Sequence, residues 1–234
     1  MIHHHFIDQP VFDFLIVEAK AIGWKLNWDK DKKKEALGML IKLGDYAKKI
    51  KRNASKRERL RFLKIKKDFE LQGWIIIQNF INGKIDREKA EKQLRKLFRK
   101  KYQEAFTSGW RSSGLSEWVG LSEEDWQWLE SALREEFTYL SNFLDDIQKG
   151  YQKMPYKKRW SMYVETLEHV FLTGKLSVIP EDYVIDWIMS EAEHCKGCEY
   201  LKRHSPYTVF TLPTVPKAGA TPCLSNCKCK LRVR

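Results

Sequence analysis

The first 194 of the chain's 234 residues contain no cysteine, so a disulfide framework is excluded for most of its length. Long apolar runs are also missing: the longest are FLIV at 14–17 and WIII at 74–77, far short of the roughly 18 residues that span a bilayer. The first ten residues lack the basic and apolar regions of a secretory signal. The sequence therefore predicts a protein that is made and kept in a reducing cytoplasm, with no membrane partner.

Motifs of common enzyme chemistries are missing as well. The sequence contains no P-loop, GxGxxG, HExxH or GxSxG motif. The zinc-deaminase signature requires H-x-E and P-C-x-x-C, whereas this chain has no H-x-E and three residues separate Cys223 from Cys227. An enzyme that uses the cysteines would need a thiolate beside a base in an open cleft. We therefore expect a non-enzymatic protein, with no catalytic or cofactor-binding residues and no small-molecule substrate.

Acidic residues are scarce in one part of the chain. Residues 30–101 hold 25 lysines and arginines against nine acidic residues, a local charge of +16 within a total of +12. One face or end of the molecule should therefore be strongly positive, and such a field attracts DNA or RNA. The alternative is a set of lysine-rich, solvated helix surfaces, as in many heat-adapted proteins.

The apolar spacing up to about residue 175 is helical, and it predicts a mainly α fold with a small irregular β, zinc-stapled C-terminal module. We expect a basic helical region at 1–110, a linker loop and long helical hairpin at 111–178, and a cysteine-rich module at 179–234. The N-terminal and cap signals predict helices from Pro10 to about Ile22, around 36–46, from Asn53 or Ser55 to about 80, from Asp86 to Phe106, from Ser122 to Gly150 and from Pro155 to Gly174.

The helix that follows Ser122 has the strongest signal. Ser122 and Asp125 stand at the spacing of a capping box, and acidic residues fill the first turn. Apolar residues then recur at three- and four-residue intervals, which predicts one continuous buried stripe of Trp126, Leu129, Leu133, Phe137, Leu140, Leu144 and Ile147. Before it, TSGWRSSGLSEWVG reads as a loop, and the similarity of YQEAFTSG (102–109) to LEHVFLTG (167–174) suggests either a duplicated hairpin or chance.

All five cysteines lie in the last 42 residues, as C-x2-C, 24 residues, then C-x3-C-x-C. Two such knuckles can direct four sulfurs to one tetrahedral Zn²⁺. We therefore predict a structural zinc held by four of the five residues Cys195, Cys198, Cys223, Cys227 and Cys229, with His194 a less favoured substitute. Three alternatives are less favoured. A cytoplasmic chain with an odd number of cysteines disfavours disulfides, the clustering of the cysteines disfavours unpaired structural thiols, and the absence of a thioredoxin-like context disfavours a redox CxxC.

The residues around these cysteines resemble a known family. Trp187, AEHCKGC at 192–198, LP at 212–213, Pro216 and TPCLSNCKCKL at 221–231 are similar to the C-terminal signature of minor head, or head morphogenesis, proteins of tailed bacteriophages. All five cysteines match the family's cysteines, and Asn226 with Lys228 matches its usual N-C-R-C run with Lys in place of Arg. The order of elements matches from about residue 80, only the last 45 residues are specific, and the first 75 have no counterpart that we can place.

The resemblance implies a structural head protein that contacts the phage portal or major capsid protein, is located in the virion head and is present in the host cytoplasm during assembly. The basic region would then contact packaged genomic DNA without reading its sequence. The alternative is a cytoplasmic zinc-containing nucleic-acid-binding regulator, although no helix-turn-helix signature is visible.

Overall fold

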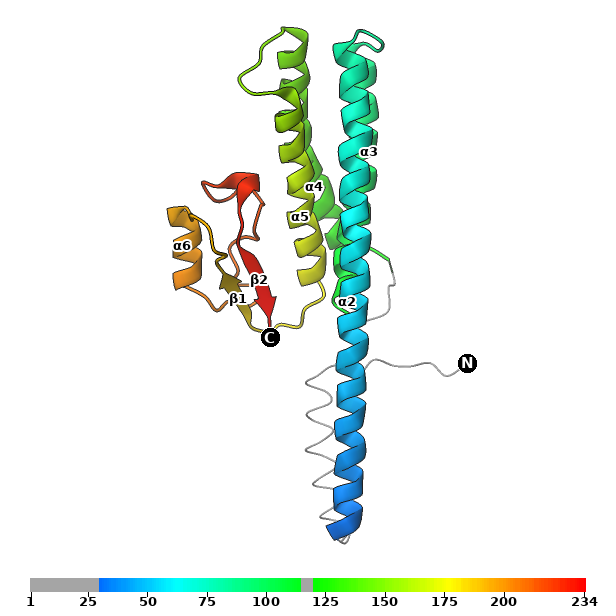
Figure 1. Cartoon of the computed structure of the whole chain (residues 1–234), viewed down its shortest axis with the longest axis vertical. Helices are drawn as coiled ribbons and strands as arrows, with labels where there is room; N and C mark the ends of the chain where they lie inside the picture. The colour runs from blue at the N-terminus through cyan, green and yellow to red at the C-terminus, as the bar shows by residue number, and fades with distance from the viewer. Residues whose placement is uncertain (1–29, 115–119) are drawn as a thin grey trace, which may run out of the picture.

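The computed structural model describes the backbone of residues 30–114 and 120–234, and the side chains of residues 55–114 and 120–234. It confirms a mainly helical protein with one small two-stranded sheet and a C-terminal cysteine cluster (Figure 1). The expected helix at Pro10–Ile22 lies outside the described residues. In chain order the elements are α2 Lys30–Ile81, α3 Arg87–Ser112, α4 Glu123–Gln148, α5 Tyr156–Leu176, β1 Ile185–Ile188, α6 Lys196–Arg203, the 3-10 helix η1 Leu224–Asn226 and β2 Lys230–Val233.

Helix α2 corrects one expectation from the sequence. The helices predicted around 36–46 and from Asn53 or Ser55 onward form a single helix of 52 residues. From Phe62 onward its buried side, which includes Phe69 and Ile77, packs into the core formed with the other long helices. The helix continues through NAS at 53–55, where neither proline nor glycine interrupts it, and a cap preference of about 1 kcal/mol does not end it.

Helices α3 and α5 cross at two glycines. A Cβ on Gly109 would lie 2.8 Å from the carbonyl carbon of Phe171, and a Cβ on Gly174 would lie 2.9 Å from that of Phe106. The two similar segments of the sequence, each Phe-x-x-Gly, therefore face each other at this crossing. Gly109 lies within α3 and Trp110 is buried in the core, so the loop predicted from residue 107 begins only after Ser112.

Helix α4 begins with the predicted capping box. The Ser122 side chain accepts a hydrogen bond from the Asp125 backbone N–H at 3.1 Å, and the Asp125 carboxylate accepts from the Ser122 N–H at 2.9 Å. Leu129 and the later members of the apolar stripe are buried. Trp126 is 40% exposed and does not join them, because the helical core begins one turn later.

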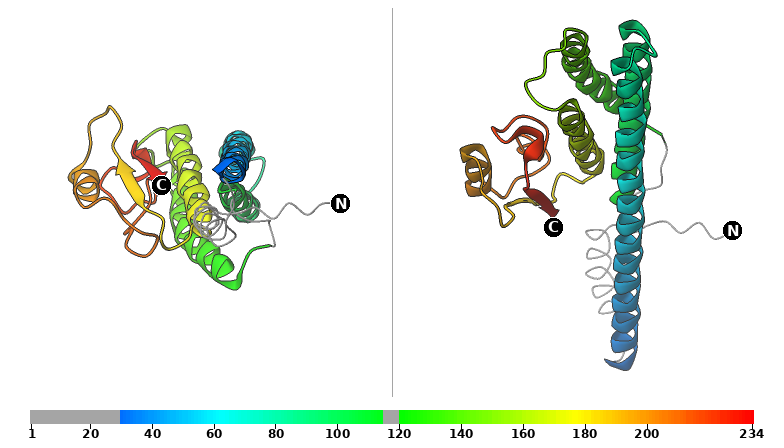
Figure 2. Two further views of the ribbon diagram at one scale, coloured as in Figure 1. Left: turned by 90° about the horizontal axis from the view of Figure 1, so that it is seen from below. Right: turned by 45° about the horizontal axis from the view of Figure 1, so that its top comes forward.

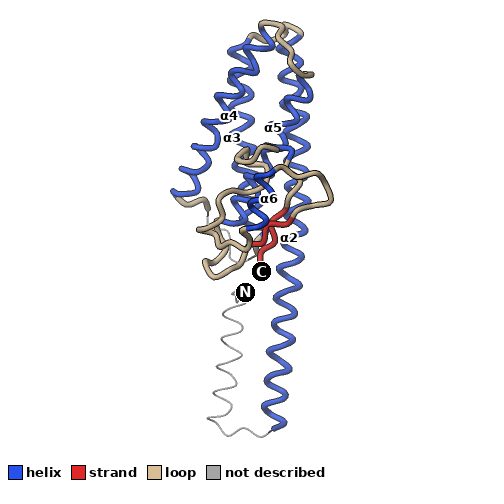
Figure 3. The backbone as a smooth tube through the Cα atoms, turned by 90° about the vertical axis from the view of Figure 1, so that its left-hand side faces the viewer, coloured by secondary structure: helices blue, strands red, loops and turns tan. Residues whose placement is uncertain are grey.

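The cysteine module, residues 179–234, lies against α5 on the side away from α2 (Figures 1 and 2). Its strands β1 and β2 pair antiparallel, with Trp187 opposite Leu231, and Figure 3 shows the pair in red in front of the long helices. The predicted strand segments YVIDWIMS and CKCKLRVR contain β1 and β2, whereas the helix α6 within the module was not predicted. No helix in the described part of the chain is both long and apolar enough to cross a membrane.

Candidate metal centre

Two segments of the chain bring the cysteines together. Cys195 is the N-cap of α6 and Cys198 lies in the first turn of that helix. Cys223 and Cys227 flank η1, and Cys229 directly precedes β2. The pairing of β1 with β2 and the packing of α6 on β1 therefore fix where the two cysteine segments meet.

The sulfur atoms lie at the spacing of a metal site. Cys198 Sγ is 3.5 Å from Cys223 Sγ and 3.7 Å from Cys227 Sγ. Four sulfurs around one zinc, each at about 2.3 Å, lie about 3.8 Å from each other in a tetrahedron. All five cysteines are free thiols, so the structure contains none of the disulfides that the sequence left open. The donor atoms form two groups that share Cys198, one with Cys195 and Cys223 and one with His194 and Cys229.

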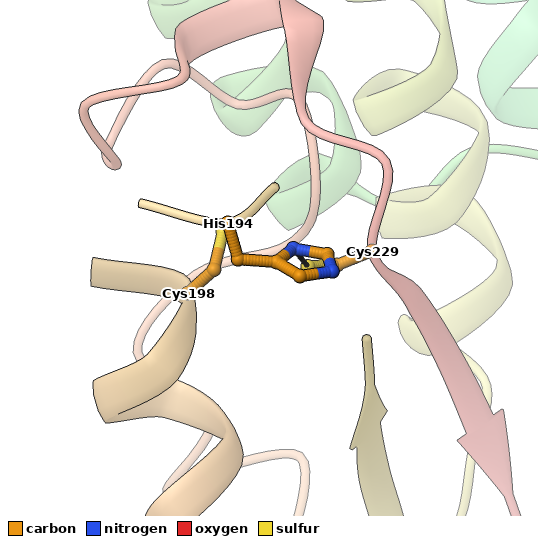
Figure 4. Close-up of side chains that lie close together, drawn as sticks. All are labelled: His194, Cys198 and Cys229. Carbon is orange, nitrogen blue, oxygen red and sulfur yellow. Dashed lines mark hydrogen bonds between the residues drawn. The ribbon is translucent and has the colours of Figure 1, made fainter. Parts of the chain in front are cut away.

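His194 also belongs to this cluster. The sequence predicted it only as a less favoured substitute for one of the cysteines. Its Nδ1 atom lies 3.6 Å from Cys229 Sγ (Figure 4). Its other ring nitrogen, Nε2, lies 2.7 Å from the Ser190 carbonyl oxygen. When Nε2–H donates to that carbonyl, Nδ1 carries no proton and can bind a metal. This is the outer-shell arrangement that orients most metal-binding histidines.

The first knuckle packs directly on the second. A Cβ on Gly197, between Cys195 and Cys198, would lie 3.0 Å from Pro222 Cδ and 3.4 Å from Thr221 Cγ2. The Thr221 hydroxyl in turn lies 3.2 Å from Cys223 Sγ. The small residue of CKGC and the Thr-Pro before Cys223 thus allow the two segments to approach closely.

The thiols differ in how readily they ionise. Burial opposes ionisation of Cys195, but the backbone N–H groups of Cys198 and Cys223 favour the thiolate and lower its pKa to about 7. Burial raises the pKa of Cys198, Cys223 and Cys229. Without a cation the cluster therefore resists carrying several negative charges, whereas a divalent metal stabilises the thiolates that bind it.

Six potential ligands are thus available for the four positions of a tetrahedral ion. Thiolate and imidazole donors fit Zn²⁺ and other borderline or soft metals better than Mg²⁺ or Ca²⁺, which prefer oxygen. The chemistry such an ion would supply is a cross-link: it would join the α6 knuckle to the η1 and β2 segments.

Comparison of the chain with known protein families, with curated proteins and with solved structures finds no match.

Proposed function

We propose that this chain is a structural, DNA-proximal minor head protein of a tailed phage, with a zinc-stapled C-terminal module. The resemblance of residues 187–231 to the head-protein signature supports the identity of the class. What supports the role of the module is that it brings cysteines from two distant segments together: Cys198 lies within metal-binding distance of Cys195 and Cys223, and its Sγ is 3.7 Å from Cys227 Sγ.

Zinc is the metal that the donor set favours. The module has its own small apolar cluster around Ile185, Trp187 and Leu201, and so small a core gives limited stabilisation on its own. A structural zinc can contribute about 10–16 kcal/mol to the folding of such a module. Its role here is to hold the module's shape against α5.

Contact with DNA is supported by an exposed row of lysines on α3. Lys89, Lys92, Lys96 and Lys100 follow at spacings of three, four and four residues and are all exposed, so they share one face over about 16 Å of helix. Within the part of the chain whose side chains are described, Lys89, Lys92 and Lys96 have no ion-pair partner, and the contact of Lys100 with Glu104 is long, at 4.0 Å. These charges are free to neutralise phosphates.

The salt dependence of DNA binding tests this row. Replacing Lys89, Lys92, Lys96 and Lys100 with Gln should weaken binding to duplexes of any sequence. It should also reduce the slope of log K against log salt by up to about 3.6, because each phosphate contact contributes about 0.9. The matched control replaces four exposed lysines near the α4–α5 turn, Lys149, Lys153, Lys157 and Lys158. Equal losses in both variants would mean that only net charge matters and would contradict a binding face on α3.

Fractionation tests the assignment to the head. In cells producing the phage, the protein should sediment with DNase-treated heads and be cross-linked to portal or major capsid protein. Recovery only in the soluble lysate, together with binding to defined host DNA sites, would favour the regulator instead.

A further inference from the structure

A cleft lies where the cysteine module meets the helices. It has a volume of about 590 Å³ and opens between α4, α5 and the segment that precedes and includes η1. Its walls are largely apolar and aromatic, with contributions from Tyr139, Met154, Met162, Tyr163 and Leu224. Clefts of this volume hold small organic molecules.

The cleft contains a carboxylate without a cation. Glu136, on α4, lines it, and among the residues whose side chains are described no lysine, arginine or histidine forms an ion pair with Glu136. The two cationic side chains that share the lining are already engaged: Arg159 with Asp146 at 2.5 Å and Lys217 with Glu165. Among the residues whose side chains are described, the hydroxyl groups of Tyr102 and Thr166 favour the ionised form of Glu136. A partly buried carboxylate in apolar surroundings is costly unless a cation pairs with it.

Two further polar atoms in the lining have no hydrogen-bond partner among the described residues. They are Nδ1 of His169, a residue 9% exposed, and Oγ of Ser225, a residue 5% exposed. Burial lowers the pKa of His169 to about 4, so its ring is neutral at physiological pH and one ring nitrogen can accept a hydrogen bond. Native proteins leave few buried polar atoms without a hydrogen bond, so an unpaired one indicates a ligand, a water molecule or another partner.

We infer that this cleft binds a small organic amine in its protonated form, with an apolar body. The ammonium group would pair with Glu136 and donate to acceptors such as Ser225 Oγ, while the apolar body would pack on the methionine and tyrosine side chains. Aromatic faces of tyrosine add attraction for a cation. The inference is independent of the proposed head function, because it rests on the cleft and its unpaired polar groups.

Methionine methyl groups give a direct readout of binding. The chain has five methionines; Met154 and Met162 line the cleft, whereas Met189, in the cysteine module, does not and serves as an internal reference. The full chain, labelled at the methionine methyl carbons, would be titrated at pH 8 with benzylammonium and, separately, with neutral benzyl alcohol. The alcohol matches the amine in size and apolar surface and lacks only the charge.

We expect benzylammonium to shift the Met154 and Met162 signals and to bind about ten- to hundredfold more tightly than benzyl alcohol, since hydrogen bonds to charged groups contribute that much affinity. Glu136→Gln should remove this preference for the charged probe. Glu130→Gln makes the same chemical change at an exposed position of α4 outside the lining and should leave the preference unchanged.

Three results would overturn the inference. They are equal affinity for the two probes, shifts that affect Met189 as much as the cleft methionines, and no shift at all. The comparison of the two probes on the wild-type chain stands even when Glu136→Gln does not fold. A general attraction of cations cannot mimic the expected result, because the chain's net charge of +12 repels them.

Discussion

Alanine substitutions at the crossing of α3 and α5 distinguish the effect of packing from that of helix propensity, because the two effects change the stability of the protein in opposite directions. In an exposed helix, replacing glycine by alanine stabilises by about 1 kcal/mol. At Gly109, however, the new Cβ would overlap the carbonyl oxygen of Phe171 and lie 2.8 Å from the Phe171 carbonyl carbon and 3.0 Å from the Lys175 backbone nitrogen. Carbon atoms in contact normally lie about 3.5–4.0 Å apart. Since the obstructing atoms are backbone, the two helices must separate by about 1 Å.

We therefore expect Gly109→Ala and Gly174→Ala each to destabilise the protein by about 1–3 kcal/mol, the usual cost of overpacking. For a chain of this size the midpoint of thermal unfolding, followed by far-UV circular dichroism, should fall by about 2–12 °C. The double variant should lose less stability than the sum of the losses in the two single variants, because the first substitution already separates the helices. Gln103→Ala, at an exposed position of α3, should change little. Glycine variants as stable as the wild type would refute the close crossing.

Two further predictions concern charged groups. Burial raises the pKa of Glu136 from 4.5 to about 7. The contribution of protonated Glu136 to the stability of the folded state is therefore fully present below about pH 4.5 and is lost as the pH rises through 7. Urea titrations should show wild-type stability falling relative to Glu136→Gln over this range, and parallel pH profiles would contradict it. Asp186 accepts hydrogen bonds from Arg232 and Arg234 across the β1–β2 pair, at 2.9 and 2.8 Å for the shortest contact with each, and these arginines lower its pKa. Asp186→Asn should speed proteolysis of the C-terminal strand at neutral pH, where the wild-type carboxylate is ionised. It should have no such effect at a pH low enough to protonate that carboxylate. An effect equal to that of Asp182→Asn, at an exposed position, would argue against this link.

The sequence predicted those elements whose signals are local. The Ser122 capping box and the Asp86 cap both form, since each depends on residues only three positions apart. The strand at IDWI was predicted from its β-branched and aromatic residues. The gathering of the cysteines followed from their spacing, although which four would bind an ion did not.

Features that depend on tertiary contacts were missed. The glycines at the end of each Phe-x-x-Gly are required by a helix on the other side of the crossing. His194 gave a weak signal because its role depends on the Ser190 carbonyl, which orients the ring. The cleft at Glu136 gave none, since its walls come from segments about 80 residues apart in the sequence.

Metal content tests most directly whether a metal ion holds the cysteine module together. The full chain, purified under reducing conditions, should contain about one zinc ion per chain, as measured by inductively coupled plasma mass spectrometry. Cys198→Ser should lose it, because Cys198 belongs to both donor groups. Removing the metal with a chelator should expose residues 179–234 to proteolysis while the long helices resist it. A metal-free wild-type protein whose module resists proteolysis equally well would contradict the account.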